Sequence, residues 1–155
     1  MRKFIILLLL LMPTMTFAAI SGTLVLSGTV ALVNSIAITP GNNTTLDIVA
    51  GESAKNVASV AETSNDLLGY KVYLSSVNAG QLKALTDPTK LTSYQVKYDT
   101  GSYVTPTALP VQVKNVTSLS ALTTNTSQVL VNVTAYAVAP ADTYSDTITL
   151  SIAAN

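Results

Sequence analysis

The acidic side chains are the main candidates for chemistry in this chain, because its 155 residues include neither cysteine nor histidine. Ser-His-Asp and Cys-His catalysis lack their general base, and a zinc site of the usual nitrogen and sulfur type lacks its ligands. A glycosidase needs two carboxyl groups about 5 Å or about 6.5–9.5 Å apart. Asp142 and Asp146 share one face of an expected strand, but they would lie about 14 Å apart. The sequence therefore predicts no enzyme, no metal and no cofactor.

Most of the acids stand in contexts typical of turns. Asp66, Asp87, Asp99 and Asp142 lie beside Asn, Pro or Thr, and Asp side chains form local bonds to the backbone in turns. Asp146 differs, because it occupies the apolar register of a strand. A buried charge needs partners, so we expect its carboxylate at the rim of the domain, where it accepts hydrogen bonds from loop N–H groups. The EF-hand pattern for calcium is absent.

The elements that must position these residues are strands, since a two-residue alternation dominates and no run of ten or more residues has a helical period. Turn residues separate the alternating runs. Their spacing predicts an all-β sandwich. Residues 81–85 fit either a short helical turn or an edge strand. The other strands expected beyond the N-terminal region are 45–50, 55–62, 69–77, 93–99, 109–116, 128–138 and 143–153.

The last of these runs has the clearest alternation. Thr and Ser occupy one face, and we expect the other face to be buried. We also expect this strand to form a hairpin with the strand at 128–138, through a turn at residues 140–142. The residues on its buried face are Tyr144, Asp146, Ile148, Leu150 and Ile152.

Residues 1–18 have the pattern of an export signal. Arg2 and Lys3 precede an apolar run, and small residues near Ala18 fit a signal-peptidase site. Cleavage after Ala19 would place bulky Phe17 three residues upstream, so cleavage after Ala18 is favoured. The apolar run is shorter than the 18 or more residues that a membrane span requires. We therefore expect an exported chain without an integral membrane anchor, and its remaining 137 residues suffice for one domain.

The expected mature chain carries little charge. It has six basic and eight acidic residues, a net charge of −2, and its Lys and Arg residues form no cluster. Nucleic acid is therefore not expected as a partner, since a protein binds phosphates through clustered positive charge.

A second long alternation starts directly after the export signal and covers residues 20–38. As one strand its 19 residues would extend roughly 60 Å, whereas strands usually have about 3–10 residues. Either the chain bends near Gly28 and both halves stay in the domain, or the first half pairs with a different molecule. The positions on the more apolar parity are Ile20, Gly22, Leu24, Leu26, Gly28, Val30, Leu32, Asn34, Ile36 and Ile38.

Three stretches of the chain share features with one family. Residues 62–72 read ETSNDLLGYKV, residues 141–150 read ADTYSDTITL, and the alternation at 20–38 precedes both. The first is similar to the central segment and the second to the closing strand of spore coat protein U domains. That family includes the subunits of archaic chaperone-usher pili.

The resemblance implies an incomplete immunoglobulin-like β-sandwich that lacks its final strand and is completed by a donor strand. Residues 19–28 would be the donor-strand extension and residues 29–155 the pilin-like domain. A periplasmic chaperone would fill the groove first, and the extension of a neighbouring pilin subunit would replace it at an outer-membrane usher. The protein would pass through the periplasm into a fimbria at the cell surface, as a shaft subunit in cell adhesion. The donor residues would be Ile20, Gly22, Leu24, Leu26, Gly28 and Val30, and the groove would follow the buried face of the terminal strand.

A different class of function is a closed, secreted β-sandwich that binds a ligand, such as a lectin-like or matrix protein. In that case residues 20–28 would complete their own sheet. Tyr side chains would supply the stacking surfaces for sugars, because both Phe residues lie in the export signal and the chain has no Trp. A secreted hydrolase is a third class, disfavoured by the absence of His, Cys and paired acids.

Overall fold

The computed structural model describes residues 21–42 and 44–155, and none of these residues forms a helix. The export signal expected at 1–18, and Ile20, lie outside the described residues. Ala31–Asn155 form one compact unit, and residues 21–30 lie outside it. The strands are β1 (Asn34–Pro40), β2 (Glu52–Ser64), β3 (Tyr70–Ser76), β4 (Gln81–Ala84), β5 (Leu91–Tyr98), β6 (Tyr103–Val104), β7 (Val111–Val116), β8 (Thr123–Val133), β9 (Tyr144–Ser145) and β10 (Ile148–Ala154).

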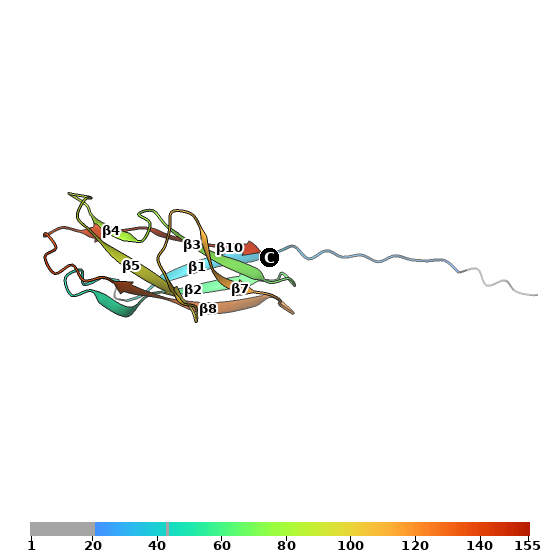
Figure 1. Ribbon diagram of the computed structural model, residues 1–155. Helices are drawn as coiled ribbons and strands as arrows, with labels where there is room; N and C mark the ends of the chain where they lie inside the picture. The colour runs from blue at the N-terminus through green and yellow to red at the C-terminus, as the bar shows by residue number, and fades with distance from the viewer. Residues whose placement is uncertain (1–20, 43) are drawn as a thin grey trace, which may run out of the picture. The chain divides into compact units, whose positions relative to one another are not determined.

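The strands of the unit Ala31–Asn155 form a β-sandwich of two antiparallel sheets (Figure 1). The larger sheet has the order β1-β2-β8-β5-β4-β9, and β6 pairs with β5 at its side. The smaller sheet has the order β10-β3-β7. The expectation of an all-β sandwich is therefore confirmed.

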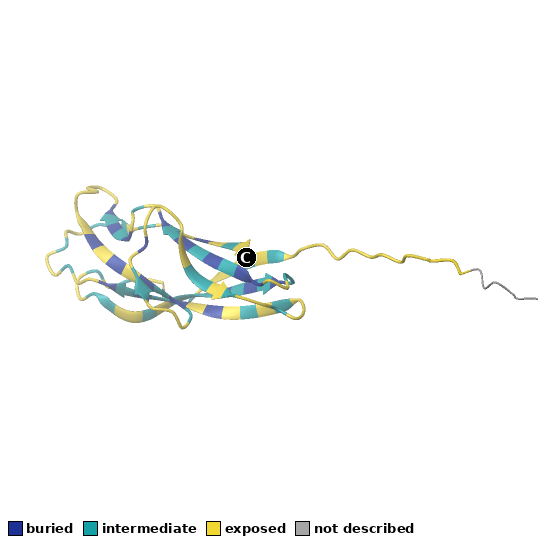
Figure 2. Cartoon of the chain, turned by 45° about the vertical axis from the view of Figure 1, so that its right-hand side comes forward, coloured by how far each residue is buried: buried dark blue, intermediate teal, exposed yellow. Residues whose placement is uncertain are grey.

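Burial alternates along the strands, as expected when one face of each sheet packs on a shared core. Along β3, Tyr70, Val72 and Leu74 are fully buried, whereas the residues between them are half-buried. Figure 2 shows the same banding on the neighbouring strands. The larger sheet contributes Val60, Leu82, Tyr94, Val96, Tyr98, Val129, Val131 and Val133, and the smaller sheet adds Leu150.

Most of the expected strands are present. The runs at 55–62, 69–77, 93–99 and 109–116 correspond to β2, β3, β5 and β7. The run at 81–85, whose sequence fits either a short helical turn or an edge strand, contains strand β4. It lies between β5 and β9 and is therefore not at the edge of its sheet.

The expectation of a strand at 45–50 is wrong, because this segment forms no strand and ends in a turn. The Asp47 carboxylate accepts a hydrogen bond of 2.8 Å from the Ala50 N–H, and the Asp47 N–H donates to Glu52 Oε1 at 2.9 Å. These side-chain bonds replace a strand ladder. Leu46 and Ile48 nevertheless pack against the core, which explains the apolar alternation in the sequence.

The expected hairpin between 128–138 and 143–153 is also wrong. β8 ends at Val133 and pairs with β2 and β5. The terminal run is interrupted after Ser145, so that β9 pairs with β4 in the larger sheet and β10 pairs with β3 in the smaller one. Alternation identifies the buried face of a strand, but it does not identify the sheet that the strand joins.

A tight turn carries the chain from β2 in one sheet to β3 in the other. The Gly69 N–H donates to the Asp66 carbonyl at 2.9 Å, and Gly69 has a φ of +82°. A Cβ atom at this position would lie 1.8 Å from the Val116 carbonyl oxygen on β7. Both the backbone conformation and the space thus require glycine.

We predict that Gly69→Ala lowers the free energy of unfolding by more than about 2 kcal/mol, because it combines a positive φ with a backbone clash. Urea denaturation of the two proteins measures the difference. Gly22→Ala is the matched control, since a Cβ there meets no atom within 4 Å. Equal midpoints for Gly69→Ala and the parent chain would contradict the prediction.

Candidate functional site

β1 and β10 are edge strands, each with one side of its backbone unpaired in the described chain. β1 pairs only with β2, and β10 pairs only with β3. Their sequences, NSIAITP and ITLSIAA, contain no charged residue. Proteins usually protect such edges with Lys, Pro or bulges, and here only Pro40 at the end of β1 does so. Each edge therefore has backbone N–H and C=O groups that no strand of the described chain pairs.

The two edges lie next to each other and run in opposite directions. The start of β1 pairs with the end of β2, and the end of β10 pairs with the start of β3. Because the short turn at 65–69 joins β2 to β3, these termini lie at the same end of the sandwich. Cα atoms of β1 and β10 come within 8 Å of each other, yet no ladder bonds connect the strands. We call this unpaired junction the β1–β10 seam.

Apolar side chains line the β1–β10 seam from both sides. Ile36 on β1 and Ile148 and Ile152 on β10 are half-buried and pack against the core, and Leu150 is buried. Ile38 on β1 retains 48% exposure. Ile38 is therefore an exposed apolar side chain on a strand whose neighbour Ile36 packs against the core.

A small apolar cavity of about 150 Å³ lies beside the start of β10. Cavities of about this volume can hold a molecule the size of benzene, so an aliphatic side chain fits. Its walls come from both sheets and from the segment after β1, and its lining residues are Thr44, Leu46, Val57, Leu82, Tyr94, Val131, Asp146 and Ile148.

The five terminal-strand residues expected to line a groove do not all share one strand. Ile148, Leu150 and Ile152 lie on β10, at the β1–β10 seam. Tyr144 lies on β9 in the larger sheet, where its ring meets Tyr136 edge to face at 6.4 Å. Asp146 lies in the link between β9 and β10.

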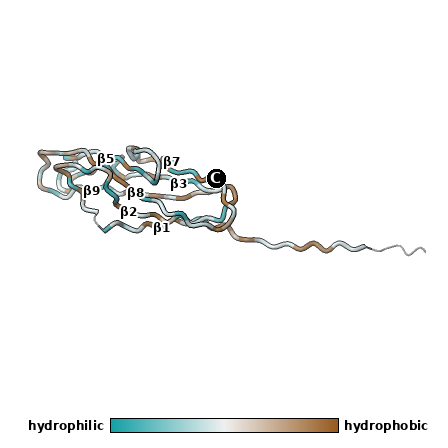
Figure 3. Tube along the Cα trace, turned by 90° about the horizontal axis from the view of Figure 1, so that it is seen from below, coloured by the Kyte–Doolittle hydropathy of each residue, from teal (hydrophilic) through white to brown (hydrophobic). Residues whose placement is uncertain are grey.

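The expected donor residues Gly22, Leu24, Leu26, Gly28 and Val30 are all exposed and form no strand. Leu24 and Leu26 expose 82% and 84% of their surface. Figure 3 shows hydrophobic and neutral stretches along residues 21–30. Within the described part of this alternation, residues 21–38, the strand begins at Asn34.

Asp146 has the structural role expected of a rim carboxylate. It accepts hydrogen bonds from the Asn78 N–H at 2.9 Å, from the Tyr94 hydroxyl at 2.7 Å and from the Ser76 hydroxyl. Ser76 Oγ in turn accepts from the Gly80 N–H at 2.9 Å. Asp146 thus ties the turn between β3 and β4 to β5, at the point where the chain passes from one sheet to the other.

A second carboxylate, Glu62, is fully buried between the sheets, and it was not among the predicted site residues. Its oxygens accept from the Tyr70 hydroxyl at 2.6 Å, from the Ser127 hydroxyl at 2.7 Å and from the Tyr98 hydroxyl. Lys114 Nζ lies 3.0 Å from Glu62 Oε2. Lys114 also pairs with Asp99 at 3.0 Å and donates to Ser127 at 2.8 Å. The sequence contains one indication that Glu62 is buried: it has the same parity on β2 as Val60, whose side chain faces the core.

Glu62 and Lys114 stabilise each other's charged form. Burial opposes ionisation of Glu62, but hydrogen bonds from Tyr70, Tyr98, Ser127 and Lys114 outweigh it, and the pKa of Glu62 lies below its ordinary value. Burial likewise opposes the charge of Lys114, yet its contacts with Glu62 and Asp99 raise its pKa. The pair is therefore ionised at neutral pH.

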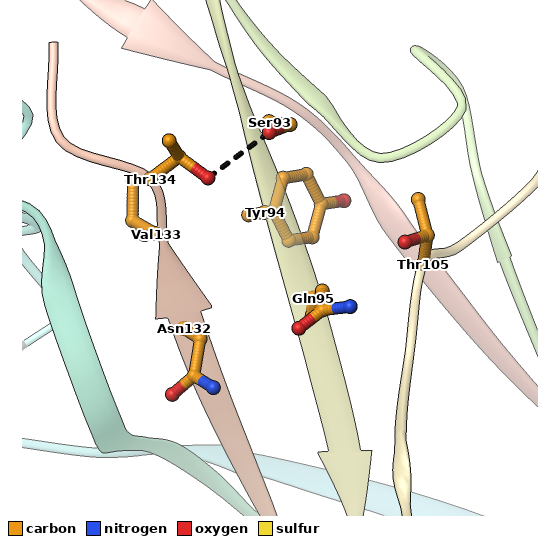
Figure 4. Close-up of a pocket in the computed structure, with 7 residues that line it drawn as sticks. All are labelled: Ser93, Tyr94, Gln95, Thr105, Asn132, Val133 and Thr134. Carbon is orange, nitrogen blue, oxygen red and sulfur yellow. Dashed lines mark hydrogen bonds between the residues drawn. The ribbon is translucent and has the colours of Figure 1, made fainter.

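A polar hollow of about 320 Å³ lies over β5 and β8 (Figure 4). Ser93 and Thr134 hydroxyls bond across it at 3.1 Å, and amide side chains of Gln95 and Asn132 lie along it. Tyr94 is only 4% exposed and donates its hydroxyl to Asp146. The hollow therefore has amide and hydroxyl groups but no open Tyr94 ring face for a sugar to stack on.

Among residues 21–42 and 44–155, no three His, Cys, Asp or Glu side chains gather in a way that could hold a metal ion. The described part of the chain also contains no helix long and apolar enough to span a membrane.

A scan against models of protein families finds no match to this chain, and a search of curated proteins finds none either.

We predict that Glu62→Gln lowers the free energy of unfolding by roughly 1.5–3 kcal/mol at pH 7, because Lys114 loses one of its two carboxylate partners and keeps only Asp99. A lowered folded-state pKa gives Glu62 a contribution that is present above its unfolded value, near 4.5, and is lost as the pH falls through the folded value. The difference between the parent chain and Glu62→Gln should therefore shrink as the pH falls below about 4.5. Denaturant unfolding across this pH range measures it.

Glu52→Gln is the matched control. Glu52 pairs with Lys55 at 2.7 Å in a less buried setting, where solvent screening makes an ion pair count for little. A loss for Glu62→Gln that is no larger than for Glu52→Gln, or that does not change with pH, would contradict the assignment.

Proposed function

We propose that this protein is a structural subunit of a surface fibre assembled by donor-strand exchange. In each subunit, the donor-strand extension at residues 19–28, continued by Val30, inserts into the β1–β10 seam of a neighbouring copy. The residues at 62–72 and 141–150 resemble spore coat protein U domains, which supports assembly through a periplasmic chaperone and an outer-membrane usher. The route then runs through the periplasm to the cell surface.

The observation that carries this proposal is the juxtaposition of two unpaired, uncharged edges, β1 and β10. Each has seven residues, which is long for an unprotected edge. A strand that pairs with both would bond to the larger sheet on one side and to the smaller sheet on the other. Strand addition of this kind takes its affinity from main-chain bonds and its register from alternate side chains.

Insertion requires the seam to open. Neighbouring strands lie about 4.8 Å apart, so a strand between β1 and β10 needs them about 9.5 Å apart. Their Cα atoms now come within 8 Å, and β1 must therefore move away from β10. The ladder bonds gained on both edges oppose the cost of this movement. The buried side-chain oxygen of Asn34 on β1 has no partner among the described residues, and a donor N–H can satisfy it.

The alternation at 21–30 provides the side chains for such a strand. Leu24 and Leu26 lie on the parity that would face the core, and Gly22 and Gly28 lie on the same parity where a side chain would be too large. Full burial of a leucine side chain contributes about 1.5–3 kcal/mol. The cavity of about 150 Å³ beside Ile148 is a site for one of these side chains.

We predict that Leu26→Asp abolishes assembly, because it would place a carboxylate in an apolar seam without a partner. The measurement is a denaturing gel of unheated full-length protein, on which strand-exchanged polymers run as a ladder. The parent chain should give the ladder, and Leu26→Asp should give monomer.

Val25→Asp provides a matched control, because Val25 and Leu26 are neighbours and are equally exposed at 84%. In an inserted strand Val25 would face away from the core, so this variant should keep the ladder. Loss of the ladder in both variants would point to a general effect of charge, and a parent chain that is monomeric under all conditions would refute strand exchange.

A ligand-binding domain is the alternative function, and the polar hollow at Ser93, Gln95, Asn132 and Thr134 is the observation that favours it. Its uncharged amides and hydroxyls suit a ligand rich in hydroxyl groups. Calorimetric titration of glycans against the parent chain and Gln95→Ala tests this function independently of assembly.

A further inference from the structure

Asn65 holds the three residues that precede β1. Its side-chain oxygen accepts from the Val33 N–H at 2.7 Å, and its side-chain nitrogen donates to the Ala31 carbonyl at 2.8 Å. Its backbone N–H donates to the Val33 carbonyl at 3.2 Å. These bonds continue the β1–β2 ladder, which ends at the pair Asn34 and Ser64. Ala31–Val33 are thereby held in line with β1.

The turn after β2 fixes Asn65 itself. The Asp66 N–H donates to Ser64 Oγ at 3.1 Å, and the Leu68 N–H donates to Asp66 Oδ1 at 2.9 Å. Gly69 closes the turn onto the Asp66 carbonyl at 2.9 Å. Asn65 is therefore attached to a turn that joins the two sheets.

The direction of β1 restricts how residues 21–30 can reach the seam of their own domain. For residues 21–30 to enter the seam of their own domain, the chain would have to reverse at Ala31–Val33 and run antiparallel to β1. That reversal would break the bonds from Ala31 and Val33 to the Asn65 side chain. The same residues of a second copy can enter without any reversal.

We propose that the Asn65 side chain is a positioning clamp that favours insertion of residues 21–30 into a second copy over insertion into their own domain. This inference rests on the proposed function. The inference assigns to Asn65 the choice between strand insertion within one chain and strand exchange between two chains.

The absence of cysteine permits a direct test. Ser27→Cys in the segment and Ser151→Cys on β10 are combined in the full-length chain, which is refolded from denaturant at one fixed concentration and treated with a short bismaleimide. Ser151 is exposed on β10, and Ser27 has the parity that would face outward in an inserted strand, so the apolar contacts stay intact. Links between chains give a ladder on a denaturing gel. Links within a chain give a monomer that carries the reagent mass and no free thiol.

With Asn65 present, we expect predominantly links between chains. Asn65→Ala should raise the ratio of links within a chain to links between chains about fivefold to tenfold, the effect of losing one or two net hydrogen bonds. Asn65→Asp keeps the acceptor for Val33 but loses the donor to Ala31, and should give an intermediate ratio. Asn78→Ala is the matched control, because Asn78 is also a turn residue and donates one amide bond, to Ser145 at 3.2 Å.

The outcomes separate the two proposals. An unchanged ratio in Asn65→Ala, or predominantly links within a chain when Asn65 is present, would overturn the clamp and leave strand insertion standing. A control pair combines Ser27→Cys with Thr126→Cys on the outer face of β8, away from the seam. If no variant gives more links than this control pair, insertion and the clamp are both refuted.

Discussion

The buried carboxylate of Glu62 is the interaction on which the two-sheet arrangement depends. Its oxygens join β2, β5 and β8 of the larger sheet to Tyr70 on β3 and Lys114 on β7 of the smaller sheet. An unpaired charge in this position would be strongly destabilising, so arrangements of the two sheets that leave it without partners are disfavoured. The chain has no disulfide to hold the sheets together, and this polar cluster fixes their mutual placement instead.

The contacts of Glu62 lie on strands other than the two that form the β1–β10 seam. Its partners occupy the region from β2 and β8 across to β3 and β7, whereas β1 and β10 belong to opposite sheets and share no ladder bond. The polar cluster can therefore hold the core in register while the β1–β10 seam opens. A sandwich that relied on all its edges for stability could not separate them, and this division of roles is a physical requirement of the proposed function.

The alternation of side chains was sufficient to predict the β class, the buried face of β10 and the rim position of Asp146. It failed at residues 45–50, where the Asp47 carboxylate bonds the backbone in a turn, and at 128–138, where the sheet that a strand joins depends on distant partners. Glu62 was missed because a single acid in an apolar register looks like a surface position until Tyr70, Tyr98 and Lys114 are brought to it from three other strands. Contacts of such separation depend on topology, which a local pattern does not contain.

The bonds between Asn65 and Ala31–Val33 also determine how this domain would carry a mechanical load. A pull on the chain at Ala31 along the axis of β1 would act parallel to the strand, whose seven residues all pair with β2. In that geometry the ladder is loaded in shear and its bonds share the force, whereas a sideways pull would break them one after another. Because the Asn65 side chain holds Ala31 and Val33 in line with β1, a pull in this direction would load the whole β1–β2 ladder at once.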